Sequence, residues 1–181
     1  MTKKTFILLS LPILISSCAT LKESNLRQDR AFLTNDNYRL LNGTYKRISV
    51  NGDKANMDDL VWVLFVKGQQ KGDRVKLELI DNQQLKVTTL SDSKIEITKI
   101  YKGKIQNGQF VLKRKVEVVP LIVANYYRKR NARLCVLDSG DLVVDAKTFL
   151  FGLSLMLPIP IFDTEKTYDN IYHKIESDSL Q

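Results

Sequence analysis

Hydrophobic and polar residues alternate in short stretches along most of the chain after residue 42. One clear example places Val75, Leu77 and Leu79 on one face of an extended segment, with charged residues between them. The same spacing recurs at Ile95 and Ile97. A period of two residues is typical of half-buried strands in an antiparallel sheet. We therefore expect strands near residues 43–50, 60–67, 73–80, 84–90, 94–101, 104–106, 109–119, 131–138, 141–147 and 167–175.

Turn-forming residues separate most of these stretches. Asn107-Gly108 and Ser139-Gly140-Asp141 are typical of hairpins, because Asn and Gly tolerate a positive φ. Polar triplets at 81–83 and 91–93 separate further strands, and Gly103 predicts a break. Short strands at this spacing, without helical crossovers, predict an all-β antiparallel domain over residues 41–176 and a disordered tail over 177–181. The favoured architecture is an up-and-down barrel of eight to ten strands, and a Greek-key β-sandwich is the alternative.

The entry to the first expected strand carries a family resemblance. Asn42-Gly43-Thr44-Tyr45 follows a possible short helix and is similar to the entry of lipocalin-like barrels, in which a Gly-x-Trp motif closes the bottom of the barrel. The resemblance implies that Tyr45 takes the place of that tryptophan. The Thr-Asp-Tyr loop motif of the family is missing, and the last strand lacks the arginine that normally covers the tryptophan.

The beginning of the chain has the pattern of an export signal. Lys3 and Lys4 precede an apolar run from Phe6 to Ile15, which is shorter than the roughly 20 residues that span a bilayer as a helix. A cationic start and a short apolar run are typical of a secretory signal peptide. We therefore expect residues 1–17 to be removed as a signal peptide.

The end of this signal determines the expected location of the protein. Leu14-Ile15-Ser16-Ser17-Cys18 resembles the bacterial lipobox. The resemblance implies that the Cys18 thiol is diacylated, that the chain is cut before it, and that the new amino terminus is acylated as well. Two or three acyl chains hold a protein stably on a membrane. Residues 18–40 would then be a lipidated tether in the cell envelope. Because Ala19 follows the cysteine, we expect the protein at the outer membrane, on the periplasmic face or the cell surface.

Charge and cysteine content narrow the range of partners. The net charge of +8 raises the question of an anionic partner. We expect no nucleic acid, because the aromatic residues are not arranged as stacking platforms among glycines. Anionic lipid headgroups or glycans remain candidates. With Cys18 acylated, Cys135 has no partner in the chain, and its apolar surroundings predict a buried thiol.

No combination of residues predicts catalysis, a metal site or a cofactor. His173 is the only histidine, and its place in the last strand favours a packed or rim residue over a catalytic base. Asp138, Asp141 and Asp145 surround a Ser-Gly turn, but they lack the spacing of a calcium-binding EF-hand loop. We therefore expect a protein that is not an enzyme.

Two apolar stretches are candidate contact surfaces. Residues 149–162 contain no charged residue, and they predict an apolar plug over the barrel, a lid, a membrane-dipping loop or a docking patch. Residues 116–130 change from apolar to doubly aromatic and then to basic, which suits either a membrane or anionic-ligand contact or a long hairpin with a solvated basic tip. The candidate contact residues are Tyr126, Tyr127, Arg128, Lys129, Arg130, Phe149, Phe151 and Phe162.

Two functions follow from these features. In the first, the protein is a lipid-anchored binding module whose barrel interior holds an apolar or amphipathic small ligand. The residues expected to line that interior are Tyr45, Val61, Val63, Phe65, Val75, Leu77, Leu79, Ile95 and Ile97. In the second, the protein is a structural or interaction lipoprotein that docks on an envelope protein complex.

Overall fold

The computed structural model describes residues 29–50, 58–64, 72–91, 94–120, 124–154 and 160–175. The described part is nearly all β, as expected. Its elements are β1 (Arg30–Ala31), η1 (Tyr38–Leu41), β2 (Gly43–Lys46), α2 (Leu60–Val63), β3 (Arg74–Asp81), β4 (Gln84–Ser91), β5 (Lys94–Gln106), β6 (Gln109–Leu112), β7 (Lys115–Pro120), β8 (Ala124–Leu137), β9 (Leu142–Ser154), β10 (Pro160–Tyr172) and β11 (Lys174–Ile175). The expected signal peptide, Cys18 and the expected tail over 177–181 lie outside the described residues.

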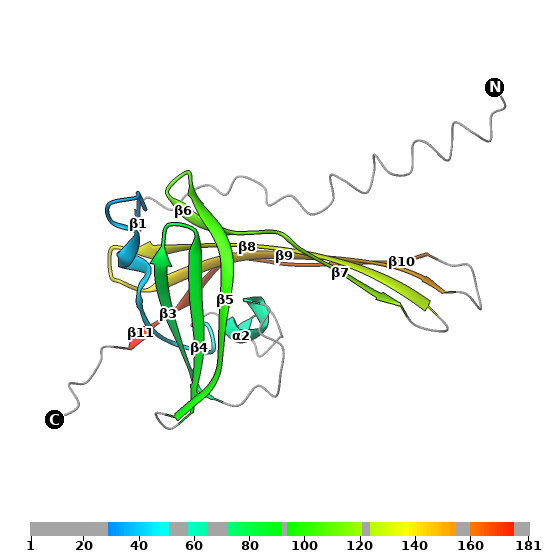
Figure 1. The fold of residues 1–181 in the computed structure, drawn as a ribbon, viewed down its shortest axis with the longest axis horizontal. Helices are drawn as coiled ribbons and strands as arrows, with labels where there is room; N and C mark the ends of the chain where they lie inside the picture. Colours follow the sequence, from blue (N-terminus) through cyan, green and yellow to red (C-terminus); the bar gives the residue numbers. More distant parts are fainter. Residues whose placement is uncertain are drawn as a thin grey trace.

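The strands form one curled antiparallel sheet of the lipocalin-like kind (Figure 1). Their order is β10-β9-β8-β6-β5-β4-β3-β2-β11, so most neighbours in the sheet are also neighbours along the chain. The exceptions are β6 and β8, with β7 paired to β8 beyond the end of β6, and β2 and β11, which come from opposite ends of the described chain. The two ends of this order, β10 and β11, are separated along the chain by His173 alone. One chain segment therefore pairs with β9 before His173 and with β2 after it, and the sheet curls round onto itself.

Two backbone hydrogen bonds strengthen this closure. Lys46 N–H donates to the His173 carbonyl oxygen at 2.9 Å, and Val50 N–H donates to the Ile171 carbonyl oxygen at 2.8 Å. Asp141 supports the same corner, because its Oδ1 accepts a hydrogen bond from the Lys174 backbone N–H at 2.9 Å. The first and last strands of the barrel are thus joined through their backbones, and the Asp141 side chain holds the last strand to the turn between β8 and β9.

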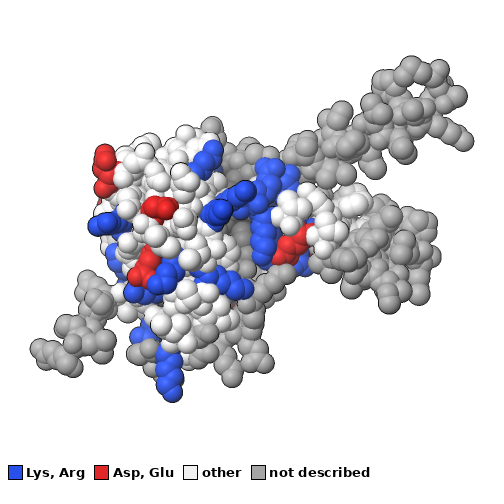
Figure 2. All heavy atoms as spheres, in the orientation of Figure 1, with Lys and Arg blue, Asp and Glu red and all other residues white. Residues whose placement is uncertain are grey.

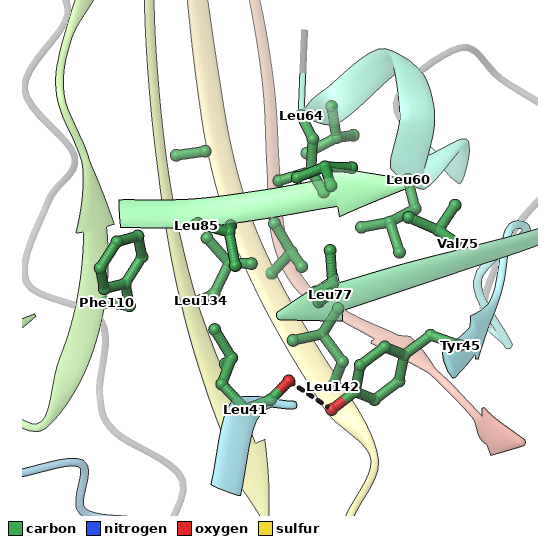
Figure 3. Packing of buried hydrophobic residues seen from close by; sticks show 14 of the residues in the cluster. Leu41, Tyr45, Leu60, Leu64, Val75, Leu77, Leu85, Phe110, Leu134 and Leu142 are labelled. Atoms are coloured by element: carbon green, nitrogen blue, oxygen red, sulfur yellow. Dashed lines mark hydrogen bonds between the residues drawn. The ribbon is translucent and has the colours of Figure 1, made fainter. Parts of the chain in front are cut away.

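Apolar side chains fill the inside of the curled sheet (Figure 3). Val75, Leu77 and Leu85 come from β3 and β4, and the alternation along these strands places them on the inner face. Tyr45 is fully buried, and its hydroxyl donates a hydrogen bond to the Leu41 carbonyl oxygen at 3.0 Å. The tyrosine therefore connects the first barrel strand to the short helix η1 before it.

The expected strand at 60–67 is wrong for its described part, since residues 60–63 form the short helix α2. Asp59 caps this helix, because its side chain accepts a hydrogen bond from the Val61 backbone N–H at 2.9 Å. Leu60, Val61, Val63 and Leu64 are all buried. A continuous apolar run fits a buried strand and a helix buried on all sides equally well, which explains the error.

Several other expected boundaries also differ from the structure. The Asn107-Gly108 and Ser139-Gly140 turns are present, with φ of 72° and 88° at the two glycines. Gly103 does not break β5. Instead, a Cβ on this residue would meet the Phe110 ring at 2.5 Å, so glycine lets the Phe110 ring of β6 pack directly against the backbone of β5. The expected strand 109–119 is divided into β6 and β7, and β8 and β9 are longer than expected.

The longer strands form a second region that we call the arm. It comprises β7, the 124–130 part of β8, the 148–154 part of β9 and the 160–167 part of β10, which are paired in that order. Figure 1 shows the arm extending away from the curled part of the sheet, which we call the body. The described residues within 149–162 pair as two strands, so they are not a folded-back plug.

Part of the segment expected to be a tether belongs to the body. Arg30 and Ala31 pair with Leu137 and Val136 of β8, and Leu33 is buried in the main core. No helix in the described part of the chain is both long enough and apolar enough to cross a bilayer.

Candidate interaction surface

The residues expected to line a cavity mostly fill the core instead. Seven of the nine belong to the core or pack against it, namely Tyr45, Val61, Val63, Val75, Leu77, Leu79 and Ile97. Ile95 lies outside the core and is 71% exposed, next to a register shift between β4 and β5. Phe65 lies outside the described residues. None of these residues lines the hollow on the outer face of the body where β5, β6 and β8 meet.

The two stretches of candidate contact residues come together in the arm. Tyr127 of β8 lies opposite Phe151 of β9, and Phe151 lies opposite Phe162 of β10. The Phe151 and Phe162 ring centroids are 5.2 Å apart. On the other side, Tyr127 lies opposite Val118 of β7. Directly opposed residues project from the same face of an antiparallel sheet. The four side chains therefore form one apolar row across the whole arm, which we call the aromatic row.

The aromatic row lies on the outer face of the sheet. Along β8 the core residues Ala132 and Leu134 point inward, so Tyr127 and Lys129 of the opposite parity point outward. Phe149 is opposite Lys129 and is buried, whereas Val118 and Phe162 are 66% and 63% exposed. The outer end of the arm therefore presents an exposed apolar surface, which is uncommon on a protein without a partner.

The inner face of the arm is charged. Arg128 and Arg130 of β8 lie opposite Glu117 and Lys115 of β7, and Lys115 and Glu117 form an ion pair at 2.9 Å. Burial lowers the pKa of the Arg130 guanidinium, and the neighbouring Arg128 lowers it further. In the body the inner face of the sheet is apolar, whereas in the arm the inner face is charged and the outer face is apolar.

A short helix lies at the root of this charged face. The Arg130 guanidinium carbon is 5.2 Å from the centroid of the Trp62 ring, so α2 and the arm are linked by a cation–π contact. Asp59 also holds α2 in place, because both of its carboxylate oxygens accept a hydrogen bond from Arg47 Nε at 3.0 Å. Arg128 and Arg130 alternate with Tyr127 along β8, so these two predicted contact residues face away from the aromatic row.

Tyr126 and Val118 show the limits of the sequence prediction. The backbone of Tyr126 pairs with Val119 and Gly152, and its side chain lies outside the described part of the structure. Val118 was missed as a contact residue, although the alternation Val116-Glu117-Val118 is a strand signal that places both valines on one face.

The residues considered for catalysis have structural roles where they are described. Burial alone would raise the pKa of Asp141, but hydrogen bonds from the Lys174 backbone, the His173 ring and the Ser139 hydroxyl outweigh it and hold the pKa below its usual value. His173 Nδ1 lies 3.3 Å from Asp141 Oδ2, at the exposed corner where the barrel closes. Among the described residues, no group of three or more His, Cys, Asp or Glu side chains is placed to hold a metal ion.

A buried polar cluster on the outer face of the body joins β1 to β8, β9 and β10. Arg133 Nε donates to Asp145 Oδ2 at 2.8 Å, and Arg30 Nη1 lies 3.7 Å from the same oxygen. Arg30 also pairs with Asp169, whose backbone N–H donates to Asp145 Oδ1 at 2.7 Å. The side chains of Arg30 and Asp145 are 4% and 1% exposed, so this cluster holds the structure together and does not form an open site.

Comparisons of the chain with protein-family models, with curated proteins and with solved structures gave no match.

Proposed function

We propose that the protein is a non-catalytic interaction lipoprotein that docks on an envelope protein through the outer face of its arm. The aromatic row is the observation that carries this proposal, because four strands contribute to one exposed apolar surface. The alternative of a small ligand inside the barrel has less support, since the expected lining residues fill a packed core.

The open edges of the arm favour a protein as the partner. In the described part of the chain, β7 and the 160–167 part of β10 each pair with one neighbour only. A partner could add a strand to such an edge and cover the adjacent apolar side chains at the same time. The lipobox-like segment ending at Cys18 supports an anchor that would keep the arm within reach of other envelope proteins.

A photo-crosslinking amino acid at two adjacent positions tests this proposal in cells. In the full chain, the probe replaces either Phe162, on the aromatic row, or Asp163, on the opposite face. We expect a discrete protein adduct from position 162 and none of the same size from position 163. Both side chains are exposed, so both variants should fold.

Two further variants serve as controls. Val118→Lys should abolish the adduct at position 162, because it places a charge in the aromatic row. Cys18→Ser should reduce the adduct if the anchor brings the arm to its partner. Cross-linking to lipid alone, or equal protein adducts from positions 162 and 163, would contradict docking through this face.

A further inference from the structure

A basic groove crosses the outer face of the body where β5, β6 and β8 meet. The hollow has a volume of about 900 Å³, which lies within the range of small-molecule sites. Figure 2 shows Lys and Arg side chains gathered where the rounded body meets the arm. None of the residues expected from the sequence to bind a ligand lines this groove.

The groove has several cations and no anion to balance them. Lys102, Lys104, Lys113 and Arg114 line it and are exposed, and none of them forms an ion pair with another described residue. No Asp or Glu appears among its described lining residues. Clustered cations without counter-charges raise the local concentration of anions.

Two buried side chains in the wall of the groove have unused hydrogen-bond donors. Gln109 is 5% exposed, and its Nε2 has no hydrogen-bond partner in the described part of the protein. Arg133 is 9% exposed, and although its Nε is bound to Asp145, its Nη2 has no partner there either. An unsatisfied buried donor is costly, so an acceptor that reached either group would stabilise this wall of the groove.

The remaining polar wall is rich in amides. The side chains concerned are Gln83, Gln84, Gln106, Asn107, Gln109 and Asn131. Asn131 Oδ1 accepts a hydrogen bond from Arg114 Nε at 3.2 Å, which fixes one of the cations at the groove. Amides both donate and accept, so they suit the hydroxyl groups of a ligand, whereas the cations suit its charged oxygens.

We propose that this groove binds a phosphate group carried on a hydroxyl-rich body. A phosphorylated sugar and the glycerophosphate headgroup of a lipid share this chemistry. In either case the phosphate oxygens would be bound by the exposed lysines and Arg114, and the hydroxyl groups by the amides. The site is separate from the aromatic row, so the proposal does not depend on docking through the arm.

Binding of two probes to the full-length protein in detergent tests the proposal. The soluble probe is glucose 1-phosphate, measured by calorimetry, with glucose as its uncharged control. The lipid probe is a short-chain phosphatidylglycerol added to the same detergent, with a short-chain phosphatidylcholine as control. We expect glucose 1-phosphate to bind and glucose not to bind. Binding of phosphatidylglycerol alone would also support phosphate recognition and would identify a lipid headgroup as its source.

Matched variants place the binding in the groove. The double variant K104Q/K113Q should weaken binding of the phosphate probe at least about tenfold, because it removes two charge-assisted contacts. Lys94→Gln is the control, since Lys94 lies at the other end of β5 and does not line the groove. Gln109→Leu should also weaken binding, because it removes a donor and keeps the approximate size of the side chain. Phe162→Ser should leave binding unchanged.

Three results would overturn the proposal. The first is that neither probe binds. The second is that glucose binds as well as glucose 1-phosphate. The third is that Lys94→Gln weakens binding as much as K104Q/K113Q does, which would show a general effect of net charge. Thermal unfolding of each variant checks that the fold is intact, and all three substituted lysines are exposed.

Discussion

At the scale of single residues, the buried charges on the outer face of the body are the most sensitive positions. Asp145 accepts a hydrogen bond from Arg133 and lies close to Arg30. Both the carboxylate and the Arg30 side chain are almost completely buried. The free energy of such a cluster depends on every member being present. Removal of one partner leaves the others as buried charges without compensation.

Asp145→Ala should therefore lower the free energy of unfolding by about 3–5 kcal/mol. Urea unfolding followed by circular dichroism measures this change. Asp163→Ala is the matched control, because Asp163 is exposed on the arm and its loss should change the stability by less than about 0.5 kcal/mol. Equal effects of the two substitutions would show that Asp145 is not energetically coupled to Arg133 and Arg30.

The sequence predicts some of these residues and misses others for a physical reason. Tyr45 and Cys135 are recognisable as inward or buried residues from their immediate neighbours, and the structure buries both. The partners of Asp145 come from β1, β8 and the 168–170 segment, which are distant along the chain. Local alternation carries no information on such pairings, so the aspartate was assigned only to the surroundings of a turn.

At the scale of elements, α2 depends on one side chain. Asp59 caps the helix through Val61 N–H and also accepts hydrogen bonds from Arg47. Helix α2 has four residues, and a helix this short is not stable without tertiary contacts. The position of Trp62 against Arg130 therefore depends on this cap.

Asp59→Ala should lower the free energy of unfolding by about 2–4 kcal/mol, since it removes a cap and a charged hydrogen-bond partner. Trp62 is the only tryptophan, so its fluorescence should also report the displacement of α2 before global unfolding. Asp59→Asn provides a comparison, because asparagine is a good cap but cannot form the ion pair with Arg47. A Trp62 spectrum that is unchanged in Asp59→Ala would contradict this role of the cap.

The arm shows why element boundaries were harder to predict than element type. Strand segments within 109–119, 131–138 and 141–147 were expected, and each is part of a longer or divided strand. No strand was expected within 149–162, yet Phe151 and Phe162 are directly paired. Cross-strand pairing extends β9 and β10 beyond what local propensity indicates.

At the scale of the whole molecule, several acidic protons are held more tightly in the folded state than in the unfolded chain. Burial raises the pKa of the Cys135 thiol from 9.0 to about 11, and burial raises the pKa of Tyr101 from 10.0 to about 12. Tyr45 and Tyr172 are shifted in the same direction by burial. As the pH rises, the unfolded chain loses these protons first.

The free energy of unfolding should therefore be nearly constant between about pH 6 and pH 9, fall between pH 9 and pH 11 through Cys135, and continue to fall as the tyrosines ionise in the unfolded chain. Urea unfolding at a series of pH values measures this decrease. Cys135→Ala should make the free energy of unfolding depend less on pH between pH 9 and pH 11. A free energy that stays constant to pH 11 in the wild-type protein would contradict the burial of these groups.

The closure at His173 also has a consequence for how the protein folds. Most strands of the sheet pair with the next one along the chain and can zip together locally, but β11 must find β2 from the other end of the described chain. Such long-range loop closure is entropically costly and slow. The ring can therefore be completed only as a late kinetic event, after the last strand has been synthesised. Until then the free edge of β2 is open to pairing with other chains, and the refolding yield should fall with protein concentration.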